Sequence, residues 1–168
     1  GLFVGLDASA ETKYVYDQAD LLTEKEEEKL QDYAEMMKEV WEMNFLIVTT
    51  DDAQGKSSME YADDFYDAQF PEESEIDGVV YLIDMDHREI YLSTSGIAIR
   101  YLTDERIDII LDTAFEHVAE GDYYGTFKAF FDESEKCFYE GIPEDQYNYD
   151  VNKGEVDYYQ EPMKLTFG

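Results

Sequence analysis

The first half of the chain changes between two hydrophobic periods, one typical of amphipathic helices and one of buried strands. Over residues 24–41 apolar side chains return every three or four positions, which predicts a helix with one buried face. Thr23 and Glu26 form a capping box, so we expect this helix to begin directly after Thr23. The residues that we expect to face the core are Leu30, Tyr33, Ala34, Met37, Val40 and Trp41.

The next segments predict a strand, a helix and a second strand. Residues 45–50, FLIVTT, form a short apolar and β-branched run, which indicates a buried strand. Ser57 and Glu60 make a second capping box and start a helix. Residues 79–83, VVYLI, are continuously apolar, as in strands that are covered on both faces. This order of elements is typical of a βαβ unit, so we expect the two strands to be parallel.

The stretch GVVYLIDMDHREIYLSTSG runs from Gly78 to Gly96 and places Asp84 and Asp86 after the apolar strand. A strand followed by D-x-D is how the nucleophile loop of haloacid-dehalogenase-type phosphatases begins. That loop leads into a helix, whereas here a strand-like segment, residues 88–94, follows almost at once. The sequence therefore favours a hairpin with a connection of two residues, and an antiparallel third strand.

The second half predicts two further helices. Thr103 caps the first, whose expected core residues are Ile107, Ile110, Leu111, Ala114, Phe115 and Val118. The second begins near Tyr123, ends near Gly141, and turns Phe127, Phe130, Phe131 and Phe138 inward. Together the elements predict the α/β class, as a three-layer α/β/α sandwich. We expect an N-terminal arm over residues 1–13, this domain over residues 14–141, and an acidic aromatic extension over residues 142–168.

The extension carries strand-like alternation on both sides of Asn152 and Gly154, which predicts a hairpin. We expect its last residues, 161–168, to lead toward a membrane tether outside this sequence. Because the chain begins with Gly1 instead of Met, we also expect the native ends to lie beyond it. No apolar run approaches the roughly 20 residues that a membrane span needs.

Composition narrows the possible partners. The chain has 168 residues, 44% of them apolar, which is enough for one domain with a core. Its 42 acidic and 12 basic residues give a net charge of −30, a field that repels nucleic acid and anionic membranes and concentrates cations. The single cysteine, Cys137, lies among phenylalanines and is interpreted as a core residue.

Carboxylates in excess favour a hard divalent cation, calcium or magnesium, over other ligands. Open α/β sheets bind ligands at the carboxyl ends of their parallel strands. The candidate ligands at that edge are Asp51, Asp52, Asp84 and Asp86. The candidates at the opposite edge are Asp77, Thr94, Ser95 and Gly96, with Asp17 near them if the first segment pairs there.

Other chemistries find little support. The fragment DVNKGEVD differs from an EF-hand loop because its glycine arrives one position early. His87 and His117 have no second His or Cys at ligand spacing, which argues against zinc. No Ser-His-Asp arrangement and no phosphate-binding glycine loop can be argued from the sequence. Arg88 and Arg100 are the nearest candidates for a phosphate clamp.

Five ordered segments resemble the TPM domain, the thylakoid-lumen acid phosphatase family. They are YVYDQADLLTEKEEEKL, NFLIVTTDDAQGKSSMEYADDFYD, DGVVYLIDMDHREIYLSTSG, YLTDERIDIIL and EGDYYGTFKAFF, between Tyr14 and Phe138. Asp17, Asp77 and Gly96 match the family positions best. The chain departs from the family where Ile76-Asp77-Gly78 replaces D-N-G, and where one glycine is lost around Thr94-Ser95-Gly96-Ile97.

The resemblance implies an α/β/α sandwich that binds calcium or another divalent cation. It also implies an extracytoplasmic, cell-surface or membrane-anchored location, as in bacterial members, with a membrane or envelope protein as partner. Plant members of the family imply a metal-dependent acid phosphatase acting on phosphate monoesters. We therefore carry two hypotheses, and prefer a non-catalytic cation-binding interaction domain because no nucleophile or positioned base is evident.

Overall fold

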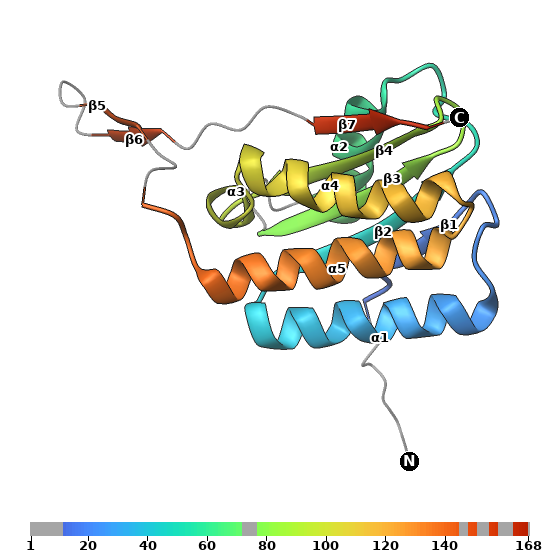
Figure 1. The fold of residues 1–168 in the computed structure, drawn as a ribbon, viewed down its shortest axis with the longest axis horizontal. Helices are drawn as coiled ribbons and strands as arrows, with labels where there is room; N and C mark the ends of the chain where they lie inside the picture. The colour runs from blue at the N-terminus through green and yellow to red at the C-terminus, as the bar shows by residue number, and fades with distance from the viewer. Residues whose placement is uncertain (1–11, 72–76, 145–147, 151–154, 158–162, 168) are drawn as a thin grey trace, which may run out of the picture.

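The computed structural model describes residues 12–71, 77–144, 148–150, 155–157 and 163–167. Its centre is a five-stranded sheet in the order β1-β2-β3-β4-β7 (Figure 1). The first three strands are mutually parallel, while β4 runs antiparallel to both β3 and β7. The strands are β1 Val15–Asp17, β2 Asn44–Thr50, β3 Gly78–Asp84, β4 Glu89–Ser95 and β7 Met163–Thr166.

Helices cover both faces of the sheet, so the predicted three-layer sandwich is confirmed. Helices α1, α4 and α5 lie on one face, and α2 packs on β3 and β4 from the other face (Figure 1). A short helix, α3, follows β4 directly. The helices are α1 Glu24–Trp41, α2 Ser58–Gln69, α3 Ala98–Tyr101, α4 Asp104–Ala119 and α5 Tyr123–Glu140. Within the described residues, no helix has both the length and the apolarity to cross a bilayer.

The capping boxes correctly predicted where the first two helices begin. Thr23 and Ser57 are the observed N-caps, and in both caps the capping box is complete. The β3–β4 hairpin is also confirmed, but its connection is four residues long, 85–88, and the prediction of two residues was wrong. Asp84 extends β3 by one residue, and Arg88 takes a left-handed conformation (φ 58°) that turns the chain into β4.

Strand β3 contacts the helices on both faces of the sheet, because successive side chains along a strand point to opposite faces. On one face, the Tyr81 ring stacks on Phe130 of α5 with centroids 4.9 Å apart, and its hydroxyl donates to Ser134 Oγ at 2.8 Å. On the other face, β3 packs against α2. One core prediction fails: Val40 is 52% exposed, because α1 turns only Leu30, Ala34 and Met37 fully inward.

The C-terminal extension contains the predicted hairpin and one further strand. Strands β5 (Asn148–Asp150) and β6 (Glu155–Asp157) pair antiparallel, although the predicted tip lies outside the described residues. Strand β7 then pairs with β4, with Thr166 opposite Glu89. Residues 163–166, which we expected to lead toward a tether, are thus the edge strand of the main sheet.

One polar contact joins the end of α4 to the start of α5. Asp122 is the N-cap of α5 and accepts a hydrogen bond from the Gly125 amide at 2.9 Å. Its other oxygen lies 2.9 Å from His117 Nδ1. The hydrogen bond from His117, supported by the Gly125 amide, holds the pKa of Asp122 below its ordinary value.

Replacing Asp122 by alanine should therefore lower the free energy of unfolding by about 1 kcal/mol at pH 7. A depressed folded-state pKa contributes stability above the unfolded-state pKa and loses it as the pH falls through the folded value. The difference between the native chain and Asp122→Ala should thus shrink as the pH falls below about 4. Urea melts at pH 7, 5 and 3 would measure it, with Asp112→Ala on the exposed side of α4 as control. A difference that stays constant with pH would contradict this account.

Candidate functional site

Two buried carboxylates face one another at the base of the β3–β4 hairpin. Asp84 is the last residue of β3 and Glu89 the first of β4, and they are direct cross-strand partners. Asp84 is 0% exposed and Glu89 is 8% exposed. Like charges directly opposite in an antiparallel pair destabilise the sheet, and burial removes the water that would screen them. This pair therefore needs compensation from its surroundings.

The first turn of α2 supplies one hydroxyl to the pair. Ser58 Oγ lies 2.7 Å from Asp84 Oδ2 and 2.6 Å from Glu89 Oε1, and the residue is only 1% exposed. A serine hydroxyl has one hydrogen to donate, so it can satisfy one carboxylate at a time. The hydroxyl therefore has no second hydrogen for the other short oxygen–oxygen contact.

His87 completes the group from the hairpin connection. Its Nδ1 lies 2.7 Å from Asp84 Oδ2, and its backbone amide donates to Asp84 Oδ1 at 3.1 Å. The hydrogen bond to Asp84, and the charges of the neighbouring carboxylates, raise the pKa of His87 above its ordinary value. One donor atom each from Asp84, His87 and Glu89 fall within 4.8 Å of one another. We call these three residues the hairpin cluster.

The other aspartates predicted at this edge hold the loops together instead. Asp86 Oδ2 accepts the Ala53 amide at 2.9 Å, which ties the hairpin to the β2–α2 loop. Asp52 Oδ1 accepts the Gln54 amide at 2.8 Å. Asp51 is exposed directly after β2. Of the four aspartates expected here, the structure places only Asp84 in the cluster.

Asp17 lies at this same edge of the sheet, because the first segment does not pair in the way that would bring Asp17 to the opposite edge. The parallel register aligns Asp17 with Thr49, near the carboxyl end of β2. Its carboxylate accepts the Thr49 hydroxyl at 2.6 Å and the amides of Leu21 and Leu22 at 3.0 and 2.9 Å. These bonds indicate that Asp17 shapes the turn before α1.

At the opposite edge, Asp77 clamps the turn that follows β4. Its Oδ1 accepts the Ile97 amide at 2.7 Å. Gly96 has φ +63°, and a Cβ there would collide with the Asp77 carboxylate. Only glycine therefore allows this close approach without strain. The pairing of Asp77 with Gly96 explains both residues structurally, without a ligand.

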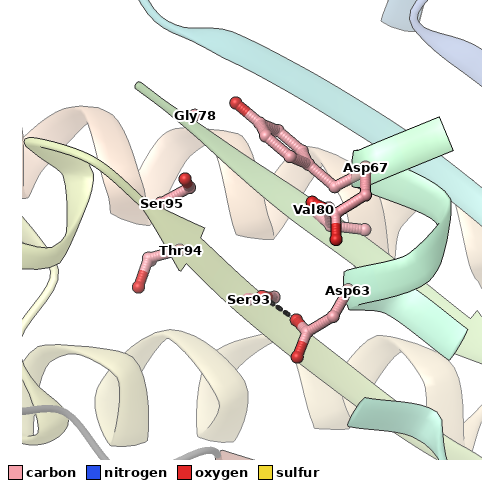
Figure 2. Close-up of a pocket in the computed structure, with 8 residues that line it drawn as sticks. Asp63, Asp67, Gly78, Val80, Ser93, Thr94 and Ser95 are labelled. Carbon is pink, nitrogen blue, oxygen red and sulfur yellow. Dashed lines mark hydrogen bonds between the residues drawn. The ribbon is translucent and has the colours of Figure 1, made fainter. Parts of the chain in front are cut away.

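A cavity of about 300 Å³ opens beside this edge, between α2 and β4 (Figure 2). Asp63 on α2 accepts the Ser93 hydroxyl at 2.8 Å across its wall, and burial is the main cause that raises the pKa of Asp63. The lining residues are Asp63, Tyr66, Asp67, Gly78, Val80, Ser93, Thr94 and Ser95. Of the residues predicted for a pocket at this edge, Thr94 and Ser95 line the cavity, whereas Gly96 and Arg100 are not among its described lining residues.

The two arginines considered as phosphate clamps lie apart from the cavity lining. Arg100 belongs to α3. Arg88 lies in the hairpin connection, where its guanidinium stacks 4.8 Å above the Phe167 ring. The cavity presents two carboxylates and several hydroxyls, and a phosphate dianion would meet like charge there.

Ser58, His87 and Glu89 are the site residues that the sequence analysis missed. The sequence analysis assigned Glu89 only to a strand, and Ser58 only to the first turn of the helix that Ser57 caps. The argument against zinc considered only His and Cys as partners of His87, whereas the structure surrounds it with carboxylates. The signal that could have found them is the hairpin register, which places Glu89 opposite Asp84.

The hairpin cluster and Ser58 are not arranged as a nucleophilic triad. Ser58 contacts the two carboxylates, and at 1% exposure its hydroxyl lies out of reach of a substrate. A Ser-His-Asp triad needs the histidine on the serine, whereas here His87 Nδ1 contacts Asp84. Two carboxylates and one imidazole are instead a donor set for a divalent metal ion.

Solved structures share this fold at low sequence identity. The N-terminal domain of a protein from P. gingivalis has a TM-score of 0.69 and 18% identity, covering 80% of this chain and 87% of that one. The N-terminal domain of cg2496 from Corynebacterium glutamicum has a TM-score of 0.60 and 14% identity, covering 79% and 84%. BA42 from Bizionia argentinensis has a TM-score of 0.60 and 13% identity, covering 73% and 84%.

Sequence comparison identifies a relative and a family. The chain is 29% identical over 129 residues to the UPF0603 protein YdjH of Bacillus subtilis strain 168, covering 77% of this chain and 49% of that protein. It thus spans about half the length of that relative. The family model described as the TPM domain matches residues 15–137, most of the described sheet and all five helices up to Cys137. This chain belongs to the TPM domain family.

Proposed function

We propose that this chain is a divalent-cation-binding interaction domain, and that the hairpin cluster holds the ion. The observation that carries the proposal is the pair of buried carboxylates, Asp84 and Glu89, which share one serine hydroxyl. A cation between them would supply the positive charge that this hydroxyl cannot supply to both.

The charge of the whole chain supports the same function. At −30, the protein concentrates cations around itself and repels nucleic acid and anionic lipid. Partners that dock on such a surface should be basic. The family resemblance adds an extracytoplasmic location, membrane attachment through a segment outside this sequence, and an envelope protein as partner; we keep these as part of the proposal.

Acid phosphatase activity is the second candidate, and it rests on the family resemblance. A phosphate monoester would need a positive group at its phosphate, from a metal ion or a basic side chain. The cavity between α2 and β4 offers Asp63 and Asp67 instead. The metal would then have to recruit the phosphate at the hairpin cluster. If the protein hydrolyses p-nitrophenyl phosphate at pH 5, and Asp84→Asn and chelation both abolish this activity, acid phosphatase becomes the preferred function.

We expect chelator-stripped protein to bind one divalent ion per chain in a saturable calorimetric titration. Calcium and magnesium, the ions that the sequence favours, should be titrated beside zinc at physiological ionic strength. Replacing Asp84 by asparagine removes a buried ligand charge and should weaken the tightest of these ions by more than about tenfold. The matched control is Asp86→Asn, two residues away, whose carboxylate serves the Ala53 amide.

Three outcomes of this titration are informative. Loss of the site only in Asp84→Asn supports the proposal. Loss in Asp63→Asn instead would move the site to the cavity between α2 and β4. Weak binding at many sites, equal for all three ions and unchanged in every variant, would mean that the carboxylates are structural and would contradict the proposal.

Ser58→Ala provides an independent stability test. Without the hydroxyl, Asp84 and Glu89 face each other with less compensation, so the metal-free protein should lose about 1–3 kcal/mol of unfolding free energy. A saturating cation should restore more of this loss in Ser58→Ala than in Ser57→Ala, because Ser57 caps α2 without touching the cluster. Thermal melts with chelator and with excess ion would compare the two variants. Equal restoration in both would show that the cation does not relieve the carboxylate pair.

A further inference from the structure

We propose that the hairpin cluster selects a zinc-class ion, a small four-coordinate metal that accepts nitrogen ligands, over calcium. This inference rests on the proposed function, because it names the ion for the same site. It departs from the ions expected from the sequence, which assumed a site made of oxygen ligands alone. The number and kind of donor atoms in the hairpin cluster favour such an ion.

The first point is the imidazole. His87 Nδ1 already lies 2.7 Å from Asp84 Oδ2, on the side chain of the cluster that is most open to solvent, at 41% exposure. Calcium and magnesium are hard ions that take oxygen ligands, whereas imidazole suits zinc and its neighbours in the first transition row. A nitrogen among the three donors therefore disfavours calcium.

The second point is the denticity of Asp84. Its Oδ1 accepts the His87 backbone amide at 3.1 Å, so this oxygen is committed to the hairpin turn. Only Oδ2 faces Ser58 and the His87 ring. Calcium sites collect 6–8 oxygens and often use a bidentate carboxylate. A single oxygen from Asp84 is instead the ligation expected for a four-coordinate ion.

The third point is that nearby oxygens are already engaged. Asp86, two residues from Asp84, turns one oxygen to the Ala53 amide, and Asp52 turns one to the Gln54 amide. Recruiting these carboxylates to fill a calcium shell would cost hydrogen bonds that hold two loops. One imidazole and two carboxylates, with water in the fourth position, make up the kind of shell that zinc accepts without further protein ligands.

The spacing of the donors requires only a small adjustment. Zinc bonds of about 2.0–2.2 Å in a tetrahedron place ligand atoms roughly 3.4 Å apart. The three donor atoms now lie within 4.8 Å of one another. Zinc would replace the hydrogen that His87 Nδ1 shares with Asp84, and the Ser58 hydroxyl would give up one of its two carboxylate contacts. A water ligand would have to reach the ion from the side of His87, the exposed member of the cluster.

The test uses the two histidines of the chain as a matched pair. Zn²⁺ and Ca²⁺ are titrated separately into chelator-stripped protein, and Co²⁺ serves as a spectroscopic probe because tetrahedral cobalt absorbs strongly in the visible range. We expect one zinc per chain, bound at least about 100-fold more weakly by His87→Ala, since even outer-shell changes cost about 10–100-fold. His117→Ala should bind zinc as the native chain does, because His117 lies beside Asp122 at the α4–α5 junction.

Each outcome separates this inference from the proposed function. Calcium bound as tightly as zinc, lost in Asp84→Asn and unaffected by His87→Ala, would overturn the zinc assignment and keep the cation-binding function. Cobalt spectra typical of six oxygen ligands would also overturn it. No saturable binding of either ion would reject both proposals. Thermal melts of both histidine variants verify that the fold survives, as expected for an exposed side chain.

Discussion

The register between β3 and β4 is the constraint on which the site depends. It places Asp84 opposite Glu89 on the face of the sheet that α2 covers, so that two carboxylates are buried as direct neighbours. Nothing in the propensity of either strand favours that pairing. It persists because the apolar residues before Asp84 and after Glu89 fix the alignment: a shift by one residue would turn the apolar side chains of one strand to the wrong layer. The fold thus imposes an unfavourable pair, which its surroundings must neutralise.

Sequence reasoning predicted the framework well because framework signals are local. The capping boxes at Thr23 and Ser57 lie within four residues, and the parallel βαβ unit follows from the order and length of its elements. Val40 shows the limit of such patterns, since it lies 52% exposed while Leu30, Ala34 and Met37 form the buried face of α1.

The site was harder to predict because its contacts are distant in sequence. Ser58 meets Asp84 and Glu89 across 26 and 31 residues, and no local pattern identifies this meeting. The aspartates in the sequence indicated the edge of the sheet where the hairpin cluster lies, but they could not separate the cluster residue from aspartates that hold loops. Asp17, Asp52 and Asp86 each hold backbone amides, as aspartates near turns commonly do. The pairing of β3 with β4 had to be known before a role could be assigned to each carboxylate.

The hairpin cluster draws all three of its donors from residues 84–89, a single turn and its flanks. Ser58 of α2 contacts two of these donors from outside the hairpin. It follows that such a site can be gained or lost through a few substitutions in one hairpin, without rebuilding the domain. Under the proposed function, relatives with the same fold need not bind the same ion.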